Sequence, residues 1–384
     1  MTNTDEHIDM TLDAGYGETI KQLKAADERI VMTLDAGGTN FVFSALQGGK
    51  EIVQPLNLPA CPNDLDSCLE ALKQGFMQIK QSLSDKPVAI SFAFPGPADY
   101  PAGIIGDLPN FPSFRGGVAL GPYLEELFKV PVFINNDGDL FAYGEAITGV
   151  LPEINERLKS AGSIKRYDNM LGVTLGTGFG CGVVLKSKLL SGDNSAGGDI
   201  WCFRNKKYPQ FIIEDSVSIR AVKRVYTELS GDKAELTPKD IFDIAEGTTP
   251  GNRDAAIKAF EELGESAGDA ISAAITIVDG IIAVGGGLSG AAKYIIPAMV
   301  KEMNSSIGMM TGESFNRLQM KVFNLDDDTQ FEEFVKSRSS KVVIPGTDRT
   351  IDYDPMKRIG VMTSKQGTNR SISTGAYMYA LNQL

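Results

Sequence analysis

The sequence predicts an α/β fold of two similar domains with a cleft between them. Residues 30–46 and 170–185 each have the pattern of a strand, a glycine-rich turn and a second strand, and the two patterns lie about 140 residues apart. A pattern repeated at such a distance indicates that the fold consists of two similar halves. The length of 384 residues agrees with this, because it exceeds what one ordinary hydrophobic core supports.

The remaining elements follow from local patterns. Short apolar runs predict buried strands, and apolar residues at helical spacing predict helices. Outside the two turns, strands are predicted at 88–94, 132–134, 280–284 and 320–325. Helices are predicted at 65–82, 140–146, 237–246, 255–277, 291–303 and 375–384. Residues 312–364 alternate short strands with polar turns, and their pattern indicates no purpose.

Composition excludes several classes of protein. The net charge of −12 opposes binding to nucleic acid or to an anionic membrane surface. The first thirty residues have no signal-peptide pattern, and the longest apolar run, 270–278, is too short to span a bilayer. We therefore expect a cytoplasmic protein without nucleic-acid or membrane partners.

Cysteine and histidine usage narrows the possible chemistry. The four cysteines show no paired spacing, which argues against a disulfide framework and against structural zinc. His7, in the polar N-terminal tail, is the single histidine of the chain, so no mechanism can depend on a histidine base elsewhere. Proton transfer must then fall to carboxylates, lysine, tyrosine or cysteine.

Two glycine turns are candidate phosphate sites. In the first, Asp35 ends a strand and is followed by Gly37, Gly38, Thr39 and Asn40. Glycines let backbone N–H groups approach phosphate oxygens, and an aspartate at a strand end can hold Mg²⁺, usually through water. The second turn, Gly176, Thr177 and Gly178, adds a hydroxyl for the opposite side of a triphosphate. For either turn taken alone, an ordinary hairpin turn is an equally simple interpretation.

A third glycine segment, Gly285, Gly286 and Gly287, lies between a predicted strand and a predicted helix. Together with Gly290 it matches the G-x-G-x-x-G pattern of dinucleotide-binding folds. That pattern expects an acidic residue at a strand end about 20 residues later, whereas Asp326 lies roughly twice as far on. A surface for the adenine and ribose of ATP suits the segment better. The rival interpretation is an oxidoreductase, which would bind NADH and not ATP.

A carboxylate and an amide come directly after the strand 132–134. Asp137 can accept the proton of a sugar hydroxyl during attack on the γ-phosphate of ATP, while Asn136 bonds neighbouring hydroxyls. The local alternative is that these residues cap the following helix, since Asp and Asn are favoured at helix N-termini.

Taken together and in this order, these segments resemble the ROK family of repressors and sugar kinases, within the actin-like ATPase superfamily. The resemblance covers most of residues 30–310 and the last helix. It implies the duplicated actin-like (ribonuclease H-like) fold, with ATP phosphates at the two glycine turns, adenosine at Gly285 to Gly287, Mg²⁺ at Asp35 and the catalytic base at Asp137. The expected division is a tail at 1–29, an N-terminal domain at 30–137 plus about 367–384, and a C-terminal domain at 138–366.

The same resemblance implies sugar contacts at Asn110 and Glu214, whose local alternatives are a turn asparagine and a solvated glutamate. The chain departs from the family where members usually read Gly-Gly-Glu-Ile-Gly-His, because Asp199 and Cys202 replace the glutamate and the histidine. The cysteine-rich zinc segment is also missing, so we predict no zinc. An aspartate is shorter by one methylene, which puts glucose as the substrate in doubt.

The resulting prediction is an ATP- and Mg²⁺-dependent sugar kinase, glucokinase-like, that acts as a homodimer. The alternative is a non-catalytic ROK-type sugar-binding or regulatory protein. Regulators of this family carry a helix-turn-helix domain before the ATPase fold, whereas the 29 residues before the first predicted strand are few and acidic. The sequence therefore favours the kinase.

Overall fold

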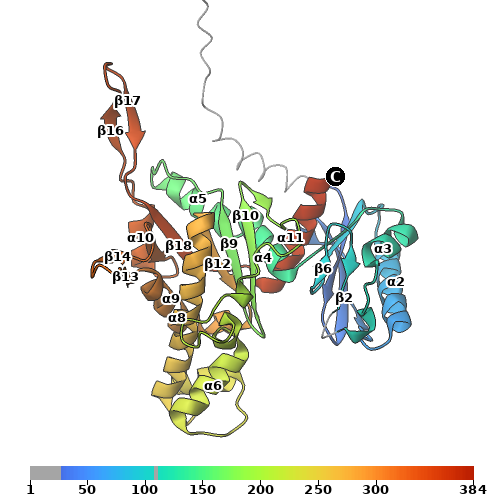
Figure 1. The fold of residues 1–384 in the computed structure, drawn as a ribbon. Coiled ribbons are helices and arrows are strands. Elements are labelled where there is room, and N and C mark those ends of the chain that lie inside the picture. Colours follow the sequence, from blue (N-terminus) through green and yellow to red (C-terminus); the bar gives the residue numbers. More distant parts are fainter. Residues whose placement is uncertain (1–26, 108–110) are drawn as a thin grey trace, which may run out of the picture.

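The computed structural model describes residues 27–107 and 111–384. Within these ranges the chain forms two six-stranded sheets, which lie side by side with helices around and between them (Figure 1). The two predicted hairpins, each made of two strands joined by a glycine turn, are confirmed. Residues 31–47 form the first two strands of one sheet, and residues 170–185 form the first two strands of the other. No helix in this part of the chain is long and apolar enough to cross a membrane.

The first sheet has the order β3-β2-β1-β5-β8, with β4 also paired to β2. Helices α2 (Leu65–Ser82) and α3 (Leu120–Phe128) cover one face, where a core rich in phenylalanine is buried. The α2 helix starts where predicted because the side chain of Asp64 accepts a hydrogen bond from Asp66 N. The strands are β1 Val31–Ala36, β2 Asn40–Gln47, β3 Lys50–Glu51, β4 Leu56–Pro59, β5 Ala89–Ala93 and β8 Val132–Asn135.

The second sheet has the order β11-β10-β9-β12-β18-β15. One face is covered by α6 (Ile219–Ser230), α7 (Pro238–Glu246), α8 (Arg253–Val278) and α9 (Ala292–Met303), and the other by α4 (Asp137–Thr148), α5 (Val150–Ser160) and α10 (Asp328–Val335). Both faces are therefore dry, as a mainly parallel sheet requires. The strands are β9 Met170–Leu175, β10 Phe179–Leu185, β11 Lys188–Leu189, β12 Ile281–Gly285, β15 Lys321–Asn324 and β18 Arg358–Thr363.

Helices α4 and α11 (Thr368–Gln383) cross between the two sheets (Figure 1). Helix α11 packs on β1, β5 and β8, and α4 packs on β9 and β10, so each helix joins one sheet to the other helix. At the crossing, a Cβ atom on Gly144 would collide with the Ser371 carbonyl, and one on Gly375 with the Leu140 carbonyl. The two backbones touch there. The domain limits at 137 and about 367 stay a prediction, because these two helices belong to the contact itself.

Two hairpins leave the body of the second sheet. One consists of β13 (Ser306–Gly308) and β14 (Ser314–Asn316), and the other, which projects farther, of β16 (Ser340–Val343) and β17 (Thr350–Tyr353) (Figure 1). A smaller pair, β6 (Ala98–Asp99) and β7 (Ile104–Ile105), follows β5, and a 3₁₀ turn covers Pro112–Phe114.

Two predictions about the C-terminal part were wrong. The last helix begins at Thr368 and not at 375, because its first half is polar in sequence but packed, with Ser371 and Thr374 buried. Residues 312–364 are not only short strands and turns: they contain helix α10 and two buried strands of the central sheet, β15 and β18. The other predicted elements are present, with ends shifted by a few residues.

Candidate active site

The first glycine turn lies at the edge of the first sheet where its parallel strands end. Asp35 in β1 is level with Ala93 in β5, and Ala93 is level with Asn135 in β8. With strands about 4.8 Å apart, Asp35 and Asn135 are separated by roughly 10 Å. Packing of protein atoms around the carboxyl, and then the charge of Asp137, raise the pKa of Asp35. The two acids thus lie near each other at one edge.

Asn136 and Asp137 begin helix α4 directly after β8. Asn136 is the N-cap: its side-chain oxygen accepts from Gly138 N at 2.8 Å, and its amide donates to the Tyr100 hydroxyl at 3.4 Å. The capping interpretation of Asn136 is therefore correct, and the amide group is directed at Tyr100. Gly138 packs against β10, since a Cβ on it would lie 2.9 Å from Cys181 N. Asp137 consequently sits where the first sheet meets the second.

Asp137 is both exposed to solvent and crowded by protein atoms. That crowding raises the pKa of Asp137, while the hydrogen bond from Gly138 N lowers it. A carboxylate that is reachable from outside and more basic than usual suits the role of a general base.

The second glycine turn joins β9 to β10, and a glutamate supports it. Glu214, in the 3₁₀ segment Ile213–Ser216, accepts a hydrogen bond from Phe179 N at 3.0 Å and forms an ion pair with Arg220 at 3.3 Å. A Cβ on Gly178 would lie 2.6 Å from its carboxylate. Glu214 is therefore not the freely solvated residue of the simpler interpretation, whereas Thr177 at the tip of the turn is exposed.

The third glycine segment is next to the second turn. Gly285 in β12 is level with Thr174 in β9, so Gly286 and Gly287 follow at the same edge as residues 176–178. Gly286 has φ +88, and a Cβ on it would collide with the backbone of Leu175. Its N–H donates to Thr368 Oγ1 at 2.7 Å. The close approach of the two loops therefore requires glycine at this position.

Asp199 enters the same region from a loop of the second domain. It precedes the 3₁₀ turn Ile200–Cys202 and follows Gly198, which has φ +102 and packs against the backbone of Cys181. Its negative charge raises the pKa of Asp139 and contributes to the raised pKa of Tyr100. Across the gap, Tyr100 N donates to Ser195 Oγ at 3.2 Å, so this loop contacts the first domain.

The structure thus gathers most of the predicted site residues at one junction. Asp35 lies in the first sheet, and Asn136 and Asp137 follow its strand β8. The segments 176–178 and 285–287 lie at strand ends of the second sheet, and Asp199 and Glu214 lie at two 3₁₀ segments that pack near it. Asn110 lies outside the described residues. Among the residues that are described, no group of three His, Cys, Asp or Glu side chains is close enough to hold a metal ion by itself.

Comparison with known proteins decides the family. The family model of the ROK family matches residues 31–323, which is most of the chain. The chain belongs to the ROK family. The actin-like fold predicted for it is confirmed, because a crystal structure of a glucokinase from Parabacteroides distasonis superposes with a TM-score of 0.88 at 65% identity, over 94% of this chain and 100% of that one.

Other relatives of this ROK protein include proteins named as sugar kinases and proteins named as xylose repressors. It is 32% identical over 111 residues to a glucokinase of Thermotoga maritima, covering 29% of this chain and 31% of the relative. With an N-acetyl-D-glucosamine kinase of Vibrio vulnificus it shares 25% identity over 312 residues, covering 72% of this chain and 96% of the relative. The match to the Thermotoga maritima glucokinase spans about a third of the length of that protein.

Sequence reasoning missed Asp139, a buried acid of the ROK protein next to the predicted base. Asp139 is 4% exposed, and its Oδ1 atom has no hydrogen-bond partner among the described residues. Burial, then the charges of Asp137 and Asp199, raise its pKa well above the usual range. The alternation Asp137, Gly138, Asp139 could have shown two acids in one helix turn, but nothing in the sequence says that the second is buried.

Asp139 should therefore make stability depend on pH. Because its pKa is higher in the folded than in the unfolded protein, the folded state loses stability as pH rises from the unfolded pKa through the folded one. Asp139→Asn cannot ionise, so its midpoint of thermal unfolding should exceed that of the unmodified chain at neutral pH, with a smaller gain in acid. Asp193→Asn, an exposed position with the same charge change, is the control. An equal gain at all pH values would contradict the burial of a chargeable group.

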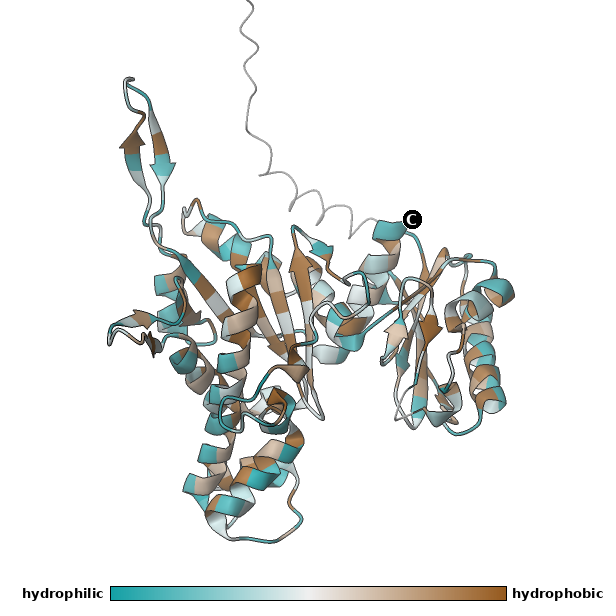
Figure 2. Ribbon diagram, viewed as in Figure 1, coloured by the Kyte–Doolittle hydropathy of each residue, from teal (hydrophilic) through white to brown (hydrophobic). Residues whose placement is uncertain are grey.

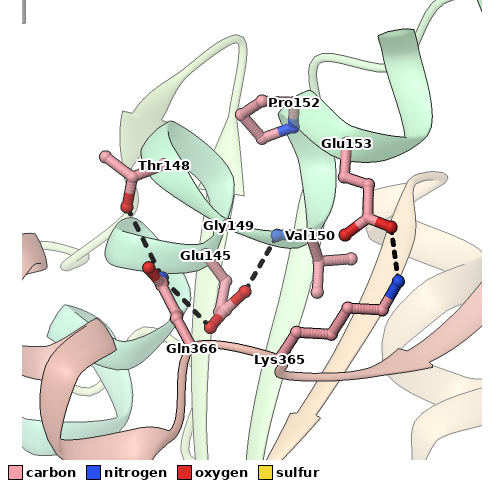
Figure 3. A pocket seen from close by; sticks show the side chains of 8 residues that line it. All are labelled: Glu145, Thr148, Gly149, Val150, Pro152, Glu153, Lys365 and Gln366. Atoms are coloured by element: carbon pink, nitrogen blue, oxygen red, sulfur yellow. Dashed lines mark hydrogen bonds and ion pairs between the residues drawn. The ribbon is translucent and has the colours of Figure 1, made fainter. Parts of the chain in front are cut away.

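A second buried acid of the ROK protein, Glu145, lies at the other end of α4, away from the base. Its two oxygens accept from Val150 N at 2.9 Å, Ser364 Oγ at 2.5 Å, Gln366 Nε2 at 3.2 Å and Ser371 Oγ. Glu145 is fully buried and borders a cavity of about 310 Å³ that the α4–α5 junction forms with the loop after β18, where Lys365 pairs with Glu153 at 2.5 Å (Figure 3). This network ties α4 to the start of α11.

Proposed function

We propose that this protein is a sugar kinase that transfers the γ-phosphoryl group of ATP to a sugar hydroxyl. The observation that carries the proposal is the place of Asp137: its charge acts on Asp35 at the first glycine turn, and it begins the helix that packs on β10, the strand that follows the second turn. Membership of the ROK family and the similarity to proteins named glucokinase support it. With glucokinase as the name of a relative at 65% identity, glucose is the first candidate acceptor, although Asp199 replaces the usual glutamate.

In this proposal the nucleotide binds between the two turns. Backbone N–H groups of Gly37, Gly38 and Gly178 face the phosphates, and the hydroxyls of Thr39 and Thr177, which are exposed, donate to phosphate oxygens. The N–H of Gly176 instead closes the turn by donating to the Gly178 carbonyl at 3.1 Å. The adenosine lies on Gly285 to Gly287 at the neighbouring strand end. Catalysis of phosphoryl transfer rests mainly on such positioning and on charge stabilisation.

The carboxylate of Asp137 accepts the proton of the attacking hydroxyl. As the sugar oxygen forms its bond to the γ-phosphorus, the bond between the γ-phosphorus and the oxygen that links it to the β-phosphorus breaks, and ADP leaves. Asn136, Asp199 and Glu214 supply the hydrogen bonds that hold the sugar, together with Asn110. Closure of the cleft would exclude water and limit hydrolysis of ATP.

Asp35 is the residue that would hold Mg²⁺ in this proposal. An exposed carboxylate at a strand end suits an ion that keeps several of its waters, and a cation there would relieve the repulsion that Asp137 exerts on Asp35. When bound, the ion neutralises charge on the phosphates. We also propose that the enzyme needs no zinc, since the cysteines and the histidine of the usual zinc segment are absent from the sequence.

We further propose a cytoplasmic homodimer. The net charge of −12 supports only the part of this proposal that the protein does not bind nucleic acid or membranes. The alternative function is a sugar-binding regulator that does not turn over. We prefer the kinase to the regulator because the described residues include Asp137, the proposed base, together with both glycine turns.

The experiment is a coupled assay of ADP release with a panel of hexoses, amino sugars and N-acetylated amino sugars. A kinase should release ADP with at least one sugar at a rate far above the rate without sugar. If sugars bind, as seen by the fluorescence of the single tryptophan, but none stimulates ADP release, the regulator is the correct alternative. Binding of NADH without binding of ATP would favour an oxidoreductase.

A further inference from the structure

Arg220 lies in the first turn of helix α6, next to the second glycine turn. The first N–H group of α6, that of Ile219, donates to the Gly176 carbonyl at 2.8 Å, so the helix begins directly on this turn. Figure 2 shows hydrophilic and hydrophobic bands on α6, as expected of a helix with one buried and one polar face. A long cationic side chain is thus anchored beside a candidate phosphate site.

The present partners of Arg220 are two acids on the surface. Its Nη2 atom lies 3.3 Å from Glu214 Oε1 and 3.9 Å from Asp215 Oδ1, and its side chain is 61% exposed. Exposed ion pairs of this length contribute little to stability, because water screens them. Both contacts use the same nitrogen, whereas a guanidinium carries five N–H donors. Arg220 can therefore exchange these contacts for a stronger acceptor at small cost.

The glycine segments of the candidate site provide no cation of their own. Residues 35–40, 176–182 and 285–290 contain no lysine or arginine, and the first of them contains an acid that lies near Asp137. The triphosphate of ATP is strongly anionic, so a site that binds it needs positive charge. The planar fork of an arginine matches two phosphate oxygens at once. The partial positive charge at the start of α6 acts in the same direction.

The carboxylate of Glu214 divides its two oxygens between two donors. Its Oε2 atom accepts from Phe179 N at 3.0 Å, whereas Oε1 accepts from Arg220. If Arg220 moves away, the hydrogen bond to Phe179 N can stay, so the second glycine turn keeps its support. The Oε1 atom then becomes available to a sugar hydroxyl, which is the contact that the proposed function gives to Glu214.

We propose that Arg220 is a phosphate-binding residue of the nucleotide site. When ATP is bound, the guanidinium leaves Glu214 and Asp215 and donates to phosphate oxygens at the second glycine turn. There it stabilises the negative charge of the phosphates during transfer. This inference rests on the proposed function, because it adds a residue to the same nucleotide site.

Calorimetric titration of the full chain with Mg·ATP, ADP and adenosine tests the proposal. Arg220→Gln removes the charge and should weaken ATP and ADP by roughly tenfold to a hundredfold, the loss expected for one charge-assisted hydrogen bond. The affinity for adenosine, which has no phosphate, should stay the same. Arg220→Lys should recover part of the ATP affinity. Arg224→Gln, one helical turn farther along α6 and paired with Glu228 at 3.3 Å, is the matched control and should bind ATP as the unmodified chain does.

A further variant separates direct contact from an effect through Glu214. Glu214→Gln keeps a side-chain oxygen for Phe179 N but loses the ion pair with Arg220. If Arg220 binds phosphate, this variant should bind ATP at least as tightly as the unmodified chain, because the guanidinium is released. If Glu214→Gln weakens ATP as much as Arg220→Gln does, Arg220 only orients Glu214 and the proposal is wrong.

The outcomes distinguish this proposal from that of the kinase. Equal ATP affinity of Arg220→Gln and the unmodified chain overturns the role of Arg220 and leaves the kinase untouched. An unmodified chain that binds no ATP overturns both. If Arg220→Gln weakens ATP but no sugar stimulates ADP release, the phosphate contact is supported and the kinase is rejected. Equal midpoints of thermal unfolding in all variants exclude misfolding as the cause of lost binding.

Discussion

Replacing Asp137 by Asn is expected to lower the turnover number by about 10² to 10⁴, the usual contribution of a positioned general base. The amide keeps the size of the side chain and can still accept from Gly138 N, so the start of α4 should stay intact. Because the substitution removes only the group that takes the proton, the affinity for ATP should change little. Turnover in the coupled ADP assay and nucleotide binding measured separately check both parts.

Asp193→Asn is the control for this experiment, because it makes the same change from carboxylate to amide at an exposed loop position. It should keep full activity. Activity of Asp137→Asn within a few-fold of the unmodified chain would refute the assignment of the base. A large loss of ATP affinity would instead indicate that Asp137 acts on the metal and nucleotide.

Replacing Glu145 by Ala is expected to cost about 3 to 5 kcal/mol in the free energy of unfolding. The change leaves the buried donor Val150 N without its acceptor, whereas Ser371 Oγ can still donate to the Gly367 carbonyl at 2.9 Å. An unsatisfied buried group costs about 1 to 3 kcal/mol, and the cavity left by the side chain adds to this cost. It also releases the loop that leads into α11. Urea-induced unfolding followed by fluorescence measures the loss.

Glu145→Gln is the matched variant for this second experiment. It keeps one side-chain oxygen for the serine hydroxyls but turns an NH₂ group toward a second donor, so its loss should fall between those of Ala and the unmodified chain. An alanine variant that loses less than about 1 kcal/mol would show that the network contributes little, as many polar contacts open to water do.

The fold, and most of the residues that lie at the junction of the two sheets, could be predicted from the sequence for physical reasons. Strand ends and glycine turns are local patterns, and in parallel sheets the ends of strands meet at one edge, so Asp35 and Asp137 could be placed together. Glu214 could be placed only through the family resemblance, because its contact with Phe179 N joins residues 35 positions apart.

What could not be predicted depends on tertiary burial. Asp139 comes just before the predicted helix 140–146, yet in the structure it belongs to α4, where packing makes it an unpartnered buried acid. The start of α11 was missed because Ser371 and Thr374 are buried by neighbours far away in the sequence. The sequence predicted short strands in the region of β16 and β17 but indicated no function for them, because a local pattern does not tell whether the apolar face of a strand is covered.

The contact of α4 with α11 through Gly144 and Gly375 has a consequence for motion. Most helix pairs interlock through side-chain ridges, and to turn one on the other requires several rotamers to change. Here the backbones touch at glycines, so a small rotation about the contact point displaces few side chains. We expect this point to act as the pivot about which the two sheets swing. A single methyl group added at either glycine would lie 2.0 Å from a carbonyl oxygen of the other helix, so it should force the two helices apart.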